Sequence, residues 1–193
     1  MNSRQAIPSA AFLLFAACAH PAPTGDHTRL PPPMRDTGVL AAPVADSLFA
    51  DSGVGPVTAG GGTFDLQIPG RRDSLRTVLA NQRAAWETAR PRDYRFLLRA
   101  QCFCPGQRGW LLMDVHGDTL EAWDRAGRPV PLTDWNTLTV NGLFYMLEQA
   151  AGRDALVEVG FDRRWHFPAT IRTRARRVPD AWSIVEARGF RPR

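Results

Sequence analysis

Lysine is absent from this 193-residue sequence, and all of its basic side chains are arginine. Without lysine the chain lacks the group needed for Schiff-base chemistry, for a lysine nucleophile or base, and for phosphate binding in a P-loop. The G-x-S-x-G, H-E-x-x-H and EF-hand motifs are also missing from the sequence. The sequence therefore favours a protein with no catalytic residue, no metal site and no cofactor, and it leans toward a non-enzymatic role.

A long hydrophobic run is missing from the N-terminus as well. The apolar segment from Ala6 to Ala17 would give a helix of roughly 18 Å, too short for a membrane core of about 30 Å. It follows Arg4 and ends in Phe15-Ala16-Ala17-Cys18, which resembles a bacterial lipobox. We expect residues 1–18 to be a lipoprotein signal peptide with Cys18 lipidated. The alternative is an ordinary signal peptide with an incidental cysteine.

The residue after the cysteine bears on the final location of the protein. Ala19 stands there in place of aspartate, and by resemblance to didermal lipoproteins this indicates sorting to the outer membrane, facing the periplasm. Residues 19–70 are rich in Pro and Gly, as in Pro31-Pro32-Pro33 and Gly60-Gly61-Gly62. Such a composition predicts a disordered tether, although one short strand at 63–68 is an alternative.

Residues 71–193 carry the periodicities of a single folded domain. Apolar residues at helical spacing predict a helix from near Arg71, capped by Asp73 or Ser74 and ended by Pro91, and a second helix capped by Thr139. Six alternating segments predict strands: 93–102, 110–115, 119–124, 156–161, 169–174 and 182–188. We expect an α+β fold in the order α-βββ-α-βββ, with an antiparallel sheet of about six strands and both helices packed on one face.

Cysteine is scarce, with only Cys102 and Cys104 besides Cys18. In an exported protein this pair is expected to form a disulfide, although two residues of extended chain separate the Cα atoms by about 6.6 Å, near the upper limit for a bridge. A redox-active pair is an alternative. A soft-metal site is another, with His116 or His166 as further ligands.

Charge is unevenly distributed along the chain. Between residues 163 and 193 there are nine arginines but only Asp180 and Glu186 as acids. An arginine-rich face attracts phosphate, including lipid headgroups, while export argues against nucleic acid as a partner; the alternative is a solvated face. Asp114, Asp118, Glu121 and Asp124 surround one hairpin and are expected to form a solvated rim.

One region is a candidate contact site for a partner. Trp165 and Phe167 flank His166 in an expected loop, where aromatic residues are less easily explained by core packing. Arg172 and Arg174 follow on the next strand. We expect these five residues to contact a partner.

Several short motifs resemble domain of unknown function family 6174, and they cover most of the chain from about residue 80 onward. The quoted residues are Trp86, Asp93-Tyr94-Arg95-Phe96, Cys102-Phe103-Cys104-Pro105, the Val115 to Gly117 hairpin, Leu143-Phe144, Phe161-Asp162 and Phe167-Pro168. The resemblance implies a small exported protein that is often lipid-anchored, and it implies no particular activity. This chain departs from the family at His166-Phe167-Pro168, where relatives tend to have Gly-Tyr-Pro, and at Arg172 and Arg174, where acidic residues are common.

Together these features give two functional hypotheses. The first is a membrane-anchored, non-enzymatic binding or structural module of the bacterial cell envelope, whose partner is an envelope protein, a glycan or an anionic lipid. The alternative is a thiol-redox or soft-metal-handling lipoprotein that uses the pair Cys102 and Cys104.

Overall fold

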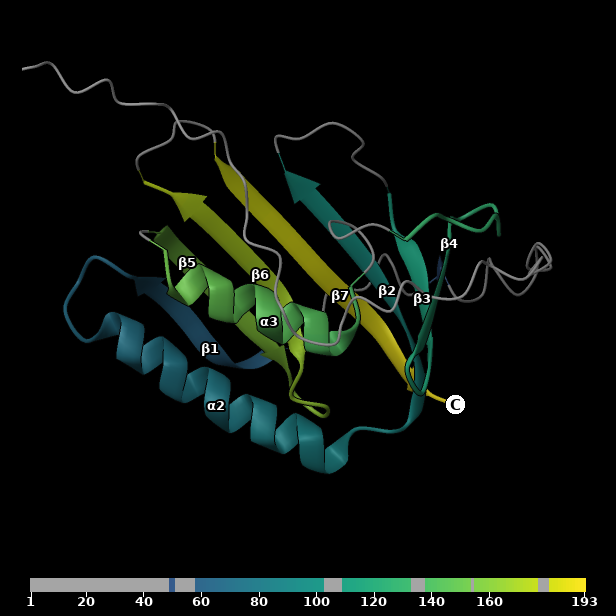
Figure 1. The fold of residues 1–193 in the computed structure, drawn as a ribbon, viewed down its shortest axis with the longest axis horizontal. Coiled ribbons are helices and arrows are strands. Elements are labelled where there is room, and N and C mark those ends of the chain that lie inside the picture. Colours follow the sequence, from purple (N-terminus) through teal and green to yellow (C-terminus); the bar gives the residue numbers. More distant parts are fainter. Residues whose placement is uncertain (1–48, 51–57, 103–108, 133–137, 154, 177–180) are drawn as a thin grey trace, which may run out of the picture. The chain divides into compact units, whose positions relative to one another are not determined.

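The computed structural model describes residues 49–50, 58–102, 109–132, 138–153, 155–176 and 181–193. They form seven strands and two long helices (Figure 1). The elements are β1 (Thr58–Asp65), α2 (Arg71–Ala89), β2 (Asp93–Cys102), β3 (Leu111–His116), β4 (Thr119–Trp123), α3 (Val140–Ala151), β5 (Ala155–Asp162), β6 (Pro168–Ala175) and β7 (Trp182–Pro192). None of the helices in these ranges is long and apolar enough to cross a membrane.

All seven strands belong to one sheet in the order β1-β5-β6-β7-β2-β3-β4, and every neighbouring pair is antiparallel. Two meanders, β2-β3-β4 and β5-β6-β7, are joined by the pairing of β2 with β7. The predicted fold class was wrong in its strand number and in its element order. The sheet has seven strands rather than six, because a strand precedes the first helix.

The additional strand, β1, lies inside residues 19–70, the range expected to be a tether. Its sequence TAGGGTFD has no alternating pattern, and Gly60, Gly61 and Gly62 all have positive φ. At Gly61 a Cβ atom would lie 2.2 Å from the carbonyl oxygen of Val159 on β5. Pairing with β5 therefore makes this segment a strand, and local sequence preference does not.

Both helices have identifiable ends. Helix α2 begins at Arg71 after Gly70, which has a left-handed backbone and no side-chain cap, so the predicted caps at Asp73 or Ser74 were wrong. It ends at Ala89 because the residue before Pro91 is forced into an extended conformation. In α3 the hydroxyl of Thr139 accepts a hydrogen bond from the Gly142 N–H at 3.1 Å, so the predicted cap is confirmed.

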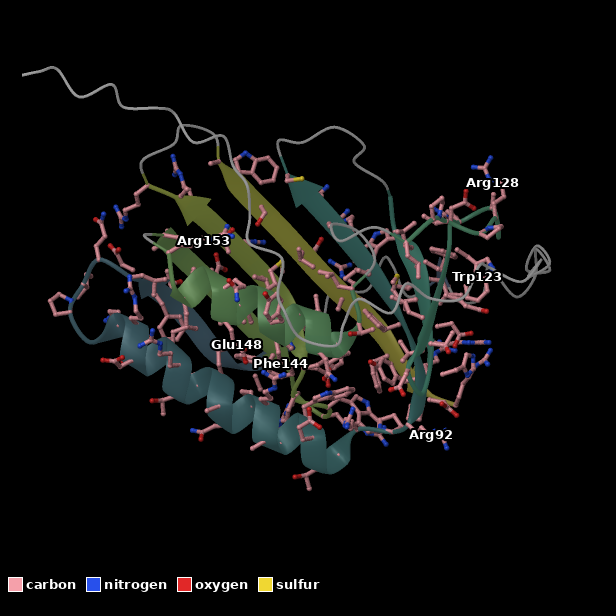
Figure 2. The ribbon with its side chains drawn as sticks, viewed as in Figure 1. Arg92, Trp123, Arg128, Phe144, Glu148 and Arg153 are labelled. Atoms are coloured by element: carbon pink, nitrogen blue, oxygen red, sulfur yellow. The ribbon has the colours of Figure 1, made fainter. Side chains whose placement is uncertain are left out.

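The main core lies between the helices and one face of the sheet (Figures 1 and 2). Phe144 projects from α3 and stacks on Phe161 of β5, with ring centroids 6.4 Å apart. Trp86 of α2 is 1% exposed, and its indole N–H donates to Asn141 Oδ1 of α3 at 3.1 Å. Every strand of the sheet except β1 and β4 contributes at least two buried side chains to this core. Neither α2 nor α3 covers the opposite face of the sheet, which we call the open face.

Candidate functional site on the open face

Strand alternation decides which side chains reach the open face. On β2, Tyr94, Phe96 and Leu98 point toward the helices, so Arg95 and Arg99 point the other way. The register then places residues of the neighbouring strands on the same face as these two arginines: Asp114 opposite Arg95, and Glu186 opposite Arg99. The open face therefore gathers charged side chains from strands that are far apart in the sequence.

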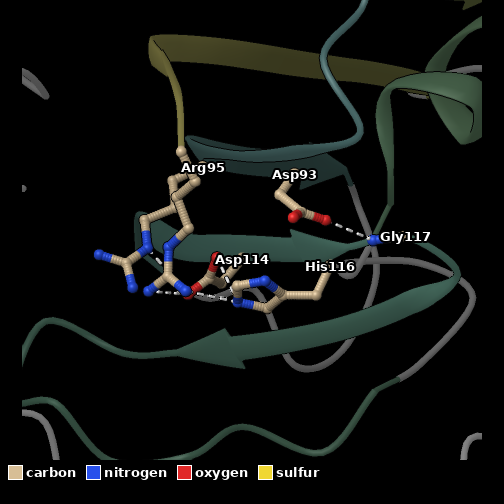
Figure 3. A network of polar contacts seen from close by, with 6 residues as sticks. Asp93, Arg95, Asp114, His116 and Gly117 are labelled. Atoms are coloured by element: carbon tan, nitrogen blue, oxygen red, sulfur yellow. Dashed lines mark hydrogen bonds and ion pairs between the residues drawn. The ribbon is translucent and has the colours of Figure 1, made fainter.

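Asp114 lies at the centre of a charged network at one end of this face (Figure 3). Its side chain is 3% exposed, and Oδ2 accepts a hydrogen bond from Arg95 Nε at 2.8 Å and lies 3.0 Å from Arg193 Nη2. Burying a carboxylate is unfavourable unless it is paired. The prediction of a solvated position for Asp114 was wrong, because two arginines from β2 and the end of the chain enclose and neutralise it.

His116 completes the Asp114 network. Its Nε2 lies 2.7 Å from Arg193 Nη1 and 3.2 Å from Asp114 Oδ1. If His116 Nε2 accepts a hydrogen bond from Arg193, it carries no proton that it could donate to Asp114. This agrees with the absence of a hydrogen bond to Asp114 Oδ1 in the described residues. At the adjoining turn, the Gly117 N–H donates to Asp93 Oδ1 at 2.9 Å (Figure 3). The network therefore fixes the ends of β2, β3 and β7 relative to one another.

A second carboxylate on the open face, Glu186 of β7, is also shared by two arginines. It accepts hydrogen bonds from Arg99 Nε at 2.9 Å and from Arg188 Nη2 at 2.8 Å. Burial alone would raise the pKa of Glu186, but the hydrogen bonds and charges of Arg99 and Arg188 hold this pKa below its ordinary value. Both guanidinium groups also lie over the Trp110 ring, 4.7 and 4.8 Å from its centroid.

An apolar cluster lies beside these charges. Phe49, from the segment before β1, packs with Leu97, Leu112 and Trp123, and all four side chains are no more than 5% exposed. Trp110 packs against their edge. This part of the open face is therefore covered by the chain itself.

At the other end of the open face, the described residues form a shallow hollow of about 220 Å³ over β5, β6 and β7. Its walls include Leu156, Arg174 and Trp182, which lie side by side across the three strands, and Ile184 in the next row. Trp182 is 38% exposed, whereas most large apolar residues of the described chain are buried. In the described part of the chain Arg174 has no ion-pair partner, in contrast to Arg172, which lies 3.4 Å from Glu158.

The five residues predicted to contact a partner are divided between two places. Arg172 and Arg174 line the hollow. Phe167 is 1% exposed, and Trp165 packs on Phe190 with ring centroids 5.1 Å apart, so both belong to the helix-side core. His166 has a positive φ of 62°, and its Nδ1 lies 3.2 Å from Gln82 Oε1 of α2. The structure therefore brings the two arginines together and places the three loop residues apart from them.

The structure describes one of the three cysteines. Cys102 is half-buried at the end of β2, whereas Cys18 and Cys104 lie outside the described residues. The disulfide and the lipidation therefore stay predictions. Within the residues that the structure describes, no group of three or more His, Cys, Asp or Glu side chains is placed to hold a metal ion.

Comparison with known proteins places the chain in a family. The model for the "Family of unknown function (DUF6174)" matches residues 78–177, slightly more than half of the sequence. The chain belongs to this family. The resemblance seen in the short motifs is thereby confirmed. Searches of curated proteins and of solved structures found no match.

The match also shows which parts of the open face lie inside the DUF6174 region. Asp114, Arg172 and Arg174 lie within it, whereas Trp182 and Glu186 on β7 lie beyond its end. Trp182 was not predicted to be part of a site. The available signal was a tryptophan at the start of an expected strand, but only the pairing of β6 with β7 places it beside Arg174.

Proposed function

We propose that this DUF6174 protein is a non-enzymatic binding module of the bacterial cell envelope, anchored at the outer membrane through lipid on Cys18 and facing the periplasm. The observation that carries the binding role is the hollow on the open face, where exposed Trp182 lies beside Arg174. Trp182 projects from a paired strand, and a tryptophan ring offers a large contact area with few rotatable bonds, so it loses little conformational freedom when a partner binds. The partner belongs to one of three classes: an envelope protein, a glycan or an anionic lipid.

A disulfide between Cys102 and Cys104 at the end of β2 is part of this proposal. An oxidising compartment favours such a bond. Counting free thiols on the purified protein before and after reduction tests it.

In-cell photocrosslinking tests the binding role on the full chain. A photoreactive amino acid replaces Trp182, and in a matched variant it replaces Tyr145, which is 47% exposed on α3. We expect adducts from position 182 and none from position 145. Equal adduct formation at both positions, or none at either, would contradict a binding role for the open face.

The anchor is tested in the same cells. The wild-type chain should incorporate labelled palmitate and sediment with the membrane fraction. A Cys18→Ala chain should carry no label. A labelled Cys18→Ala chain would show that the lipid is attached elsewhere.

A further inference from the structure

The hollow on the open face can recognise a ligand only through side chains. It lies over β5, β6 and β7, and each of these strands is paired with a neighbour on both sides. Their backbone amides and carbonyls are therefore used within the sheet, so a peptide cannot bind at the hollow by adding a strand. The chemistry of the side chains around the hollow then decides which ligand it fits.

The charges around the hollow are mostly paired with one another. Arg172 lies 3.4 Å from Glu158. Asp65, at the end of β1, forms an ion pair with Arg176. Of these three neighbouring arginines only Arg174 has no acidic partner among the described residues. Net charge therefore contributes little to recognition here, and hydrogen bonds and apolar contacts have to provide it.

The ion pair of Arg172 and Glu158 has hydrogen-bonding capacity to spare. Both side chains are about half exposed, and a single nitrogen of Arg172, Nη1, contacts a single oxygen of Glu158, Oε1. An arginine side chain only donates hydrogen bonds, and an ionised carboxylate only accepts them. A ligand that binds to both side chains must therefore carry a donor and an acceptor close together, as hydroxyl and acetamido groups do.

Apolar side chains adjoin this polar pair. Trp182 is 38% exposed, and Leu156 and Ile184 also line the hollow. The face of a glucose-type pyranose ring carries C–H groups, so it can stack on a tryptophan ring while the hydroxyls at its rim form hydrogen bonds. Two strand spacings separate β5 from β7, roughly 10 Å, which is close to the length of two linked pyranose rings.

We infer that the hollow binds a short stretch of a neutral, β-linked glycan that carries N-acetyl groups. One ring stacks on Trp182. The next ring places its acetamido methyl group on Leu156 and donates its amide N–H to Glu158, while Arg172 donates to an oxygen of the sugar. This inference rests on the proposed function, because it names which of the three classes of partner the open face binds.

The size of the hollow agrees with a segment of a polymer. Its volume of about 220 Å³ lies below the range of roughly 300–1,000 Å³ that is typical of pockets for whole small molecules. A hollow of this kind contacts part of a longer chain and leaves both ends of that chain free to continue.

Isothermal titration calorimetry on the full chain in detergent micelles tests the inference. The probe is chitotetraose, a β-linked tetramer of N-acetylglucosamine. The matched ligand is cellotetraose, which has the same linkage but hydroxyls in place of the acetamido groups. We expect chitotetraose to bind and cellotetraose to bind about tenfold more weakly, because it lacks a methyl contact and an amide hydrogen bond.

Matched variants assign the binding to the hollow. Trp182→Ala should weaken chitotetraose binding about tenfold, whereas Tyr145→Ala, at an exposed aromatic residue of α3, should leave it unchanged.

Glu158 is tested in the same way. Glu158→Ala should weaken binding roughly fivefold, and Glu158→Gln should retain most of the affinity because its amide oxygen still accepts a hydrogen bond. Glu148→Ala, which breaks an exposed ion pair with Arg83, is the control and should bind as the wild type does. Circular dichroism checks that the variants are folded, which we expect because the replaced side chains are exposed.

Three results would overturn the inference. One is an absence of chitotetraose binding, another is equal affinity for chitotetraose and cellotetraose, and the third is an equal loss in the Trp182→Ala and Tyr145→Ala chains. If chitotetraose does not bind but photocrosslinking at position 182 still gives protein adducts, the hollow binds an envelope protein, and the proposed function stands while the glycan inference fails. No binding together with no adducts would reject both.

Discussion

Two carboxylates on the open face owe their burial to arginines from other strands. Asp114 is 2% exposed and Glu186 is 8% exposed, and each is bound by two guanidinium groups. An unpaired carboxylate at either position would have to protonate or draw in water. The sheet register therefore depends on charge pairing at these two points as well as on apolar packing.

Replacing Glu186 by glutamine should destabilise the protein. The change leaves Arg99 and Arg188 facing one another with weaker hydrogen-bond acceptors between them, and charge-assisted hydrogen bonds of this kind contribute about 1–3 kcal/mol. Urea unfolding at neutral pH should show a loss of that size. Glu158→Gln, at an exposed ion pair with Arg172, is the control and should change the free energy of unfolding by less than about 1 kcal/mol.

The effect of Glu186→Gln should also depend on pH. The arginines lower the pKa of Glu186 in the folded protein relative to its ordinary value of 4.5. A carboxyl group with a lowered pKa stabilises the fold above its unfolded pKa, and this contribution is lost as the pH falls through the folded pKa. The difference between wild type and Glu186→Gln should therefore shrink below pH 4.5. A difference that grows on acidification would contradict this assignment.

At the scale of elements, the sequence predicted those whose pattern is local. The stripe of apolar residues in α3, its cap at Thr139 and the alternation of β2 are all readable from neighbouring residues, and the structure has them. Strand β1 was not predicted as it occurs, because three consecutive glycines give no alternation. Its conformation comes from pairing with β5, which lies about 100 residues later in the chain.

Gly61→Ala should destabilise β1 strongly. The new Cβ would lie 2.2 Å from the Val159 carbonyl oxygen, and the residue has a φ of +94°. Strain of this kind together with a forced backbone shift costs about 2–4 kcal/mol, which thermal or urea unfolding would measure. Gly109→Ala is the matched control, because nothing lies within 4 Å of its Cβ position. Similar stability of the two variants would show that β1 is not held against β5.

At the scale of the whole molecule, what the sequence could not show is how distant strands meet. The pairing of β2 with β7 joins the two meanders and creates the open face. It brings Arg95 and Asp114 together with the C-terminal residues, and it places Trp182 beside Arg174. The arginine excess near the C-terminus was visible in the sequence, but its arrangement on one face follows only from this long-range pairing.

The segment before β1 contributes Phe49 to the apolar packing on the open face. It is 2% exposed against Leu97, Leu112 and Trp123, so Phe49→Ala should lower the free energy of unfolding by about 3–5 kcal/mol. Ile68→Ala, at an apolar residue that is 49% exposed, should change it by less than about 0.5 kcal/mol. Equal effects in urea unfolding would mean that the segment before β1 adds nothing to the core.

The two outer strands of the sheet have a consequence for how copies of this protein behave together. Beside β4, the Val130 N–H donates to the Ala122 carbonyl at 2.8 Å, so the returning chain already occupies that border. Beside β1, the positive φ values of Gly60, Gly61 and Gly62 break the regular row of amides and carbonyls. Among the described residues neither border offers a straight ladder on which another chain can add a strand. Crowded copies of this protein therefore meet an interrupted edge at both borders, which disfavours growth into fibrils by strand addition.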